Sequence, residues 1–266
     1  MITTYILYLV LGAFAGVLAG LLGIGGGLVI VPMLNIAFEL QGFPEVHIQH
    51  VALGTSLATI IFTSLSSMRA HHKRGAINWT VFKRLTPGII TGTFIGAWIA
   101  SVLSTMFLKA LFGFFLYYVA TQMLTGKKAQ ASRDLPGTVG IFGAGNGIGI
   151  FSALVGIGGG TLTVPFLSWC NQTMHTAIAT AAAVGLPIAL AGTSGFIING
   201  LGVEGIPGPH VGYVYIPAFL GIIATSMLTA PFGAKMAHSL PVDKLKKIFA
   251  VLLYVVGTKM LWSAFM

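Results

Sequence analysis

Two copies of a glycine cluster interrupt the strongly apolar sequence of this chain. Residues 23–27 and residues 156–160 both read Gly-Ile-Gly-Gly-Gly, with four glycines in five positions. Glycine costs a helix about 1 kcal/mol relative to alanine and readily adopts positive φ, so such a cluster ends a helix. Pro32 and Pro165 stand five residues after the clusters, a spacing typical of the first turns of a new helix. We therefore expect a helix, a break and a second helix in each copy.

The clusters belong to a repeat that spans nearly the whole chain. Residues 12–34 align with residues 145–167 at an offset of 133 without a gap, and 11 of the 23 positions are identical. The offset is 125 between His50 and His175 and 137 in the last segments, so the halves differ in their loop lengths. Small residues spaced by four precede each cluster and predict close contacts between helices. They are Gly12, Gly16 and Gly20 in the first copy, and Gly145, Gly149 and Ala153 in the second.

The composition places the chain in a membrane. Apolar residues make up 56% of the sequence, charged residues only 7%, and the mean hydropathy is +0.93. A soluble globule of 266 residues needs more polar surface than this. The net charge of +9 lies in short clusters between apolar runs, which indicates membrane orientation and argues against a nucleic-acid partner. The single cysteine, Cys170, excludes an intramolecular disulfide and cysteine-rich metal sites, and we expect no cofactor.

Apolar segments of helical length number five in each half. They span residues 5–22, 28–40, 50–68, 86–103 and 107–125, and then residues 137–155, 161–171, 174–199, 213–238 and 243–263. The expected fold class is an all-α polytopic membrane protein with two repeats, residues 1–126 and 137–266. Residues 127–136 form the linker between them.

Basic residues decide the relative direction of the two repeats. Three clusters flank the loops after the third segment, between the repeats and before the last segment. They are Arg69, Lys73, Arg74, Lys83 and Arg84, then Lys127, Lys128 and Arg133, then Lys235, Lys244, Lys246 and Lys247. Placing all three loops in the cytoplasm puts 12 of the 14 basic residues inside and leaves Lys109 and Lys259 outside. This layout requires inverted repeats, a cytoplasmic linker and both chain termini on the outer side.

The glycine-broken helix pairs enter and leave the membrane on the same side in this topology. They are either re-entrant hairpins or pairs of tilted spans. The second helix of each pair is only about 11–13 residues long, too short to cross about 30 Å of hydrocarbon, which favours the re-entrant form. The chain is therefore expected to have between six and ten spans.

Irregular backbone at membrane depth must be buried in protein or line a polar cavity. Helices that begin after the two clusters would point free N–H groups and positive dipole ends at the middle of the membrane, which suits an anion. Candidate binding residues are Gly25, Gly26, Gly27, Gly158, Gly159 and Gly160, with hydroxyl donors from Thr161, Thr163, Thr55, Ser56 and Thr180. In the alternative interpretation the glycines only allow tight packing, and the threonines bond back to their own helices.

His50 and His175 occupy matching positions in the two repeats and are candidates for proton coupling, although interfacial positions would also explain them. The acidic residues fall in or near predicted loops, so a buried carboxylate carrying protons or sodium is not expected. They are Glu39, Glu45, Asp134, Glu204 and Asp243. No GxxxxGK[ST], HExxH or Ser/His/Asp arrangement is present, so an enzyme is not expected. A secondary transporter or channel for an anion remains.

The duplicated Gly-Ile-Gly-Gly-Gly followed by Val-Pro, with His-x-Ala-x-x-Thr after it, resembles the TauE/SafE family of sulfite exporters, also called TSUP. Both half-motifs match, at residues 23–32 and 156–165 and again at His50 and His175. The resemblance implies an inner-membrane carrier of sulfite or small organosulfur anions, usually an exporter driven by the proton gradient. It also implies that the anion lies at the glycine clusters and their flanking polar residues.

The leading hypothesis is a secondary transporter that exports sulfite, a sulfonate or sulfoacetate by alternating access, with one inverted repeat rocking against the other. A passive anion channel is the alternative within transport. A membrane subunit that anchors an enzyme of sulfur metabolism is the alternative from another class, although the short loops offer little surface for a soluble partner. Self-association into a homo-oligomer is left open by the sequence.

Overall fold

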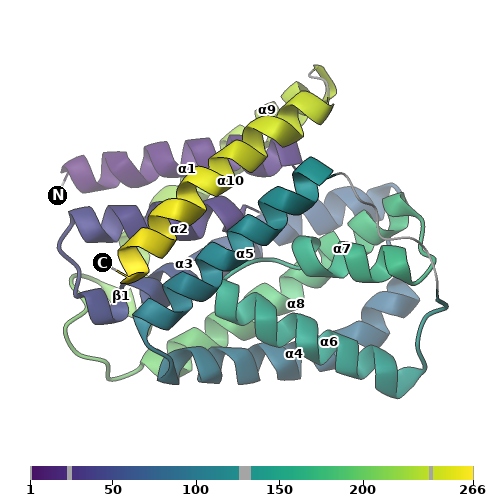
Figure 1. Cartoon of the computed structure of the whole chain (residues 1–266), viewed down its shortest axis with the longest axis horizontal. Coiled ribbons are helices and arrows are strands. Elements are labelled where there is room, and N and C mark those ends of the chain that lie inside the picture. Colours follow the sequence, from purple (N-terminus) through teal and green to yellow (C-terminus); the bar gives the residue numbers. More distant parts are fainter. Residues whose placement is uncertain (1, 23–25, 126–132, 240–241, 266) are drawn as a thin grey trace.

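Helices follow the glycine and proline pattern of the sequence in two sets of five. The computed structural model describes residues 2–22, 26–125, 133–239 and 242–265, and ten helices lie within these ranges (Figure 1). The first set is α1 (Ile2–Leu22), α2 (Gly27–Leu40), α3 (Glu45–Lys73), α4 (Trp79–Val102) and α5 (Thr105–Thr125). The second set is α6 (Thr138–Val155), α7 (Gly160–Trp169), α8 (Met174–Gly200), α9 (Ile216–Ser239) and α10 (Val242–Phe265). The all-α fold class predicted from the sequence is therefore confirmed.

Both predicted breaks are present, and glycine conformation explains them. Gly156 ends α6 with φ of 67°, and Gly26 precedes α2 with φ of 80°. L-residues rarely adopt these left-handed conformations, whereas glycine does so at little cost. Polar caps start two other helices, because Asn78 Oδ1 accepts from Val81 N and Thr173 Oγ1 accepts from Thr176 N.

The helices after the breaks are too short to cross a membrane. α2 has 14 residues and α7 has 10, which correspond to about 21 Å and about 15 Å. Among the described residues, six helices are long and apolar enough to span a bilayer, namely α3, α4, α5, α6, α8 and Lys247–Phe265 of α10. The chain is a multi-pass membrane protein.

A short hairpin separates α8 from α9, and part of it falls within the predicted ninth apolar segment, residues 213–238. β1 (His210–Val211) pairs antiparallel with β2 (Val214–Tyr215). Gly212 turns the hairpin with φ of 55°. α9 therefore begins at Ile216, three residues later than the predicted start at residue 213.

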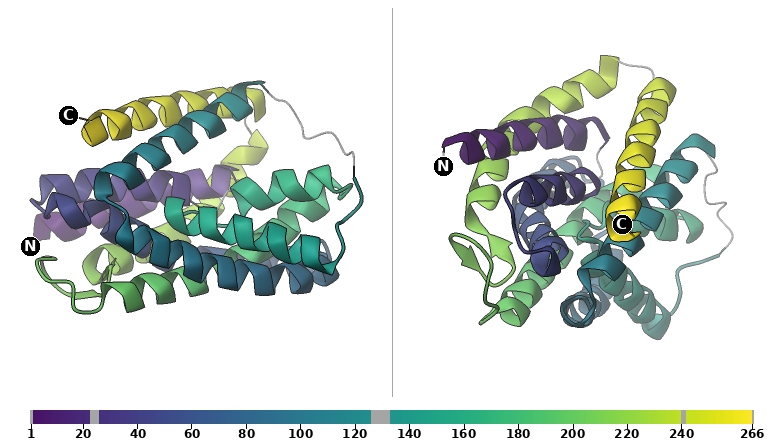
Figure 2. Two further views of the ribbon diagram at one scale, coloured as in Figure 1. Left: turned by 60° about the horizontal axis from the view of Figure 1, so that its bottom comes forward. Right: turned by 60° about the vertical axis from the view of Figure 1, so that its left-hand side comes forward.

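The basic turns gather at one end of the bundle and the termini at the other. In Figure 1 and the left-hand view of Figure 2 both chain ends lie on the left, near the turn between α4 and α5 and the β1–β2 hairpin. The α3–α4 turn, the end of α5, the start of α6, the end of α9 and the start of α10 lie at the opposite end. α1 and α6 therefore approach their breaks from opposite ends of the molecule.

The two halves interlock instead of forming separate units. α1 packs along α9, α4 packs along α6, and α3 contacts α8 while α5 contacts α10. The small residues spaced by four, on α1 and α6, lie at the α1–α9 and α4–α6 contacts. A Cβ on Gly12 would lie 2.7 Å from Ile222 Cα of α9, and one on Gly145 would lie 2.7 Å from Leu85 O of α4. The larger hydrophobic core, with Leu34 and Val184 among its buried residues, extends through both halves.

Hydrogen bonds between the halves occur in pairs at the repeat offset. Tyr117 Oη bonds to Thr258 Oγ1 at 2.7 Å, and Tyr254 Oη bonds to Thr121 Oγ1 at 2.7 Å. The partners in these two bonds are related by a shift of 137 residues, from 117 to 254 and from 121 to 258. Because α5 and α10 run in opposite directions, such a pair is what a two-fold axis across the bundle would generate.

Candidate functional site

The two glycine breaks meet inside the protein against α3. A Cβ on Gly27, the first residue of α2, would lie 2.8 Å from Gly156 O and 3.0 Å from Ile157 Cα. The Ser56 Oγ of α3 donates to Gly156 O at 3.0 Å. The fold thus brings together segments that are more than a hundred residues apart, and α2 begins directly beside the end of α6.

The candidate glycines differ in what surrounds them. A Cβ on Gly159 would lie 2.8 Å from Ala181 O, so this glycine allows α8 to approach closely, as Gly27 allows α6. A Cβ on Gly158 would meet only Ile60 Cγ2, at an ordinary 3.4 Å. Gly26 caps α2 and Gly160 is the first residue of α7, whereas Gly25 lies outside the described residues. Packing thus explains Gly27 and Gly159, but it does not explain Gly158.

Unpaired polar groups lie on both sides of the second break, near the end of α6 and at the start of α7. The hydroxyls of Thr161, Thr163 and Ser152 are buried and have no hydrogen-bond partner among the described residues. The N–H groups of Gly160, Thr161 and Leu162 likewise donate to no residue that the structure describes. Thr161 and Thr163 therefore do not bond back to their own helix. A buried group of this kind costs about 1–3 kcal/mol unless a ligand or water pairs with it.

Thr55 and Thr180 hold loops in place. Thr55 Oγ1 accepts from Tyr215 N just before α9, and Thr180 Oγ1 accepts from Asn78 N just before α4, both at 3.0 Å. Thr55 and Thr180 occupy equivalent positions in the two repeats, 125 residues apart. Their backbone partners, Asn78 and Tyr215, are also equivalent and lie 137 residues apart. Each therefore ties a central helix, α3 or α8, to the chain entering a helix of the other half.

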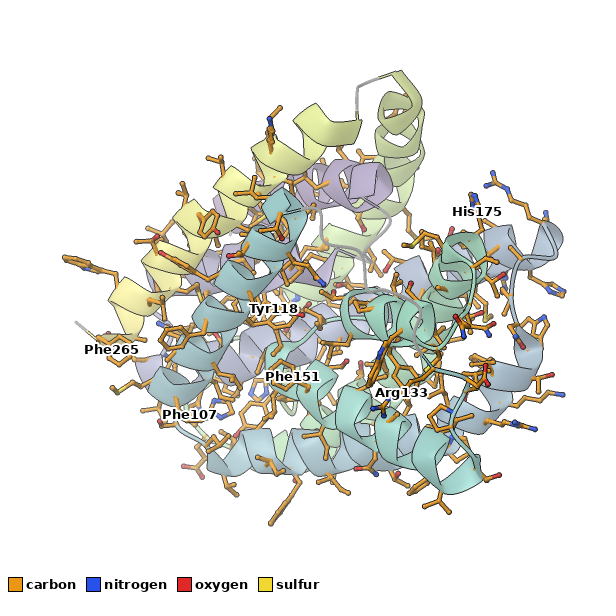
Figure 3. The ribbon with its side chains drawn as sticks, turned by 45° about the vertical axis from the view of Figure 1, so that its right-hand side comes forward. Phe107, Tyr118, Arg133, Phe151, His175 and Phe265 are labelled. Carbon is orange, nitrogen blue, oxygen red and sulfur yellow. The ribbon has the colours of Figure 1, made fainter. Side chains whose placement is uncertain are left out.

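The two candidate histidines lie in different surroundings. His50 is 4% exposed, and its Nε2 lies 3.0 Å from Ala100 O and 3.1 Å from Leu103 O at the end of α4. The Nε2 must carry the proton in this geometry, because carbonyls only accept. His175 is exposed at the start of α8, at the end of the molecule where Figure 3 also labels Arg133.

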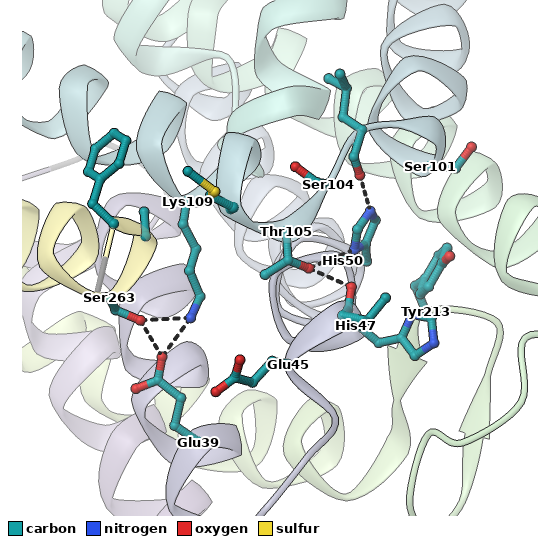
Figure 4. A pocket seen from close by; sticks show the side chains of 15 residues that line it. Glu39, Glu45, His47, His50, Ser101, Ser104, Thr105, Lys109, Tyr213 and Ser263 are labelled. Carbon is teal, nitrogen blue, oxygen red and sulfur yellow. Dashed lines mark hydrogen bonds and ion pairs between the residues drawn. The ribbon is translucent and has the colours of Figure 1, made fainter.

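His50 lines a cavity of about 840 Å³ at the end of the bundle that holds the chain termini (Figure 4). We call it the terminal cavity. Its walls come from the start of α3, the α4–α5 turn, the end of α10 and the β1–β2 hairpin, with Glu39, Lys109 and Ser263 on one side and His47 and Tyr213 on the other.

Two polar pairs were not predicted from the sequence. Lys109 Nζ lies 2.8 Å from Glu39 Oε1, and Lys259 Nζ lies 4.0 Å from Glu39 Oε2. Both lysines that the charge pattern left outside are therefore next to a carboxylate, and Glu39 sits on helix α2 in contact with a buried cation. The second pair is Asn35 and Gln49, whose Nδ2 and Oε1 lie 2.7 Å apart in the core. The amide side chain of Asn35 within the apolar segment 28–40 could have indicated this pair from the sequence.

Metal binding has no support in the described part of the chain, where no three His, Cys, Asp or Glu side chains gather as a ligand set. The unpaired N–H groups at the start of α7 can only donate, which suits an anion, and the hydroxyls of Thr161 and Thr163 can donate to the same ligand.

The sequence is similar to a family of membrane proteins and to several of its relatives. The family model described as "Sulfite exporter TauE/SafE" matches residues 8–260. A "probable membrane transporter protein" of Haemophilus influenzae is 41% identical over 262 residues, covering 98% of this chain and 99% of the relative. A protein of the same description from Methanocaldococcus jannaschii is 29% identical over 96% of this chain and 94% of its own. One from Bacillus subtilis is 26% identical over 98% of both chains. No solved structure matches the chain.

Proposed function

Because this chain belongs to the sulfite exporter TauE/SafE family, we propose that it is a secondary transporter that exports a small sulfur-containing anion. The substrate is of the sulfite, sulfonate or sulfoacetate type, and the membrane is the cytoplasmic membrane of a bacterial-type cell. The observation that carries the proposal is the cluster of unpaired donors at the meeting point of the two breaks.

The donors at the second break match the oxygens of such an anion. The first N–H groups of α7 have no partner among the described residues, and the helix dipole also favours negative charge at this end. Thr161 and Thr163 stand two residues apart and therefore face different sides of α7, and each adds an unpaired hydroxyl near the same end. An added Cβ on Gly158, two residues before α7, would meet only Ile60 Cγ2, so this position has room for a ligand. The corresponding positions of the first repeat are Leu28 and Ile30, so the second repeat supplies most of the polar contacts.

The orientation proposed from the charge pattern places the basic end of the bundle in the cytoplasm and both termini outside. Inverted repeats follow from this orientation. The paired bonds of α5 with α10, and of Thr55 and Thr180, support them. In alternating access the breaks at the centre would open in turn to the two ends of the bundle.

Proton coupling through His50 is part of the proposal. His50 lies on the terminal cavity and holds the end of α4 through two carbonyls, so a second proton on Nδ1 would place a positive charge beside the substrate route. The exposed His175 would exchange protons at the cytoplasmic end.

Transport in proteoliposomes tests the proposal. We expect saturable uptake or efflux of sulfite or a sulfonate that responds to an imposed pH gradient. Gly158→Val should reduce the rate about tenfold or more, because its branched side chain enters the space beside the donors. The matched control is Gly143→Val on α6, where an added Cβ meets nothing within 4 Å.

Two results would contradict the proposal. Full transport by Gly158→Val would remove the break from the substrate route. Flux that neither saturates nor responds to the pH gradient would indicate a passive channel.

A further inference from the structure

The terminal cavity contains a buried positive charge that the break does not use. The side chain of Lys109 is only 6% exposed, and its Nζ donates to Glu39 Oε1 and to Ser263 Oγ, both at 2.8 Å (Figure 4). Ser263 Oγ also donates to the same carboxylate oxygen at 3.0 Å. A buried ammonium is costly without an anionic partner, so Lys109 always requires one.

Two helix N-termini open onto the same cavity. Glu45, Val46 and His47 form the first turn of α3, and Thr105 and Met106 begin α5. Their positive dipole ends add to the charge of Lys109. The protein balances this positive field with its own carboxylates, Glu39 and the exposed Glu45.

We propose that the terminal cavity is a second anion site, in which the oxygens of a sulfite or sulfonate replace the carboxylate of Glu39 on Lys109 and Ser263. Glu39 is then the built-in competitor that fills the site when no substrate is present. This inference rests on the proposed function, because it places the site at the outer end of the export route.

A polar connection runs inward from this site. Asn35 lies one turn before Glu39 on α2, and its Nδ2 donates to Gln49 Oε1 of α3 at 2.7 Å. Asn35 Oδ1 and Gln49 Nε2 are buried with no partner among the described residues. Ser56, which bonds to the break, lies two turns further along α3. These amides provide polar groups between the terminal cavity and the break.

Glu39 competes with the anion in its charged form. Burial raises the pKa of Glu39, but the hydrogen bond and the charge of Lys109 outweigh this effect and hold the pKa below its ordinary value, so Glu39 remains a carboxylate at neutral pH. The other charged or titratable groups facing this region are Lys259 on α10, Glu45, His47 and His50 on α3, and Tyr213 in the hairpin turn. Because these groups also contribute to the charge in the cavity, the role of Glu39 must be separated from theirs by substitution.

Calorimetric titration of the purified full-length protein in nanodiscs tests the site. The probe is ethanesulfonate, whose charge does not change between about pH 5 and about pH 8. All variants carry Gly158→Val, which blocks the break. We expect Lys109→Gln to weaken binding about tenfold or more, because it removes the charge that pairs with the anion. Lys109→Arg keeps the charge and should bind within about threefold of the parent.

Glu39→Gln should tighten binding about fivefold or more at about pH 8, because it removes the charge that competes with the anion for Lys109. Lys83→Gln, an exposed lysine at the opposite end of the bundle, makes the same charge change as Lys109→Gln and should leave affinity unchanged. If Lys109→Gln fails to fold, as judged by gel filtration, the Glu39→Gln titration decides.

Unchanged affinity in Lys109→Gln, or weaker binding in Glu39→Gln, would overturn the site. Unchanged binding in Glu39→Gln would overturn the role of Glu39 as competitor. If the unmodified protein transports the anion but binding does not depend on Lys109, the proposed function stands and the second site is ruled out. If binding depends on Lys109 but the unmodified protein transports nothing, the second site stands and the proposed function is ruled out.

Discussion

A substitution at Thr163 distinguishes ligand binding from packing better than a substitution at the neighbouring glycines. Its side chain is fully buried and its hydroxyl has no partner among the described residues. A threonine that only stabilised α7 would bond back to a carbonyl one turn earlier, as Thr93 does to Ile89 O at 2.7 Å. An unpaired buried hydroxyl costs stability, and a ligand that pairs with it gives a reason to keep it.

We predict that Thr163→Val, which keeps the shape and removes the hydroxyl, lowers anion transport about fivefold or more without lowering the melting temperature. Thr93→Val is the matched control and should leave transport unchanged, because its hydroxyl is already paired within α4. The two measurements are sulfite flux in proteoliposomes and thermal unfolding in detergent. A lower melting temperature together with full transport would assign Thr163 to packing.

Helix pairs α1–α9 and α4–α6 depend on glycine at their crossings. Gly145 and Gly143 stand two residues apart on α6 and therefore face different directions. A Cβ on Gly145 would lie 2.7 Å from Leu85 O, whereas one on Gly143 would meet nothing within 4 Å. The sequence predicted this close contact from the spacing of small residues, but it did not identify α4 as the partner.

We expect Gly145→Ala to destabilise the protein by about 1–3 kcal/mol, because α4 and α6 must move apart. Gly143→Ala should be neutral or stabilise it by up to about 1 kcal/mol, because alanine is the better helix former. Thermal unfolding of the two purified variants compares these effects directly. Equal melting temperatures would mean that the α4–α6 crossing tolerates a wider separation.

The whole molecule has one basic end and one end that holds both termini, and the proposed orientation puts the basic end in the cytoplasm. Lys73 at the end of α3 and Glu204 before the hairpin are exposed at opposite ends. The native Cys170 follows α7 and is 2% exposed, and burial raises the pKa of its thiol. It should therefore react slowly with maleimides at neutral pH.

Cysteine labelling tests this orientation in intact cells. An impermeant maleimide added outside should modify Glu204→Cys and leave Lys73→Cys unmodified, with the unaltered protein as the background control. Inverted membrane vesicles should give the opposite pattern. Labelling of Lys73→Cys from outside would reverse the orientation and place the terminal cavity at the cytoplasmic end.

The amino-acid sequence alone determined the membrane class, the five helices in each half and the position of both breaks. These features depend on local chemistry, namely apolar runs of helical length and glycines that adopt positive φ. The matching His-x-Ala-x-x-Thr segments identified equivalent positions, and the structure shows that Thr55 and Thr180 do make equivalent bonds. The same match did not reveal that His50 is buried and His175 exposed.

Only the tertiary structure decided which distant groups meet. The contact of Gly27 with Gly156, and the ion pair of Glu39 with Lys109, join residues whose separation in the chain carries no signal of proximity. The interlocking of the halves also depends on how helix surfaces fit together across the core. Local pattern specifies where a helix begins and ends, whereas burial, shape and charge balance over the entire fold select its partners.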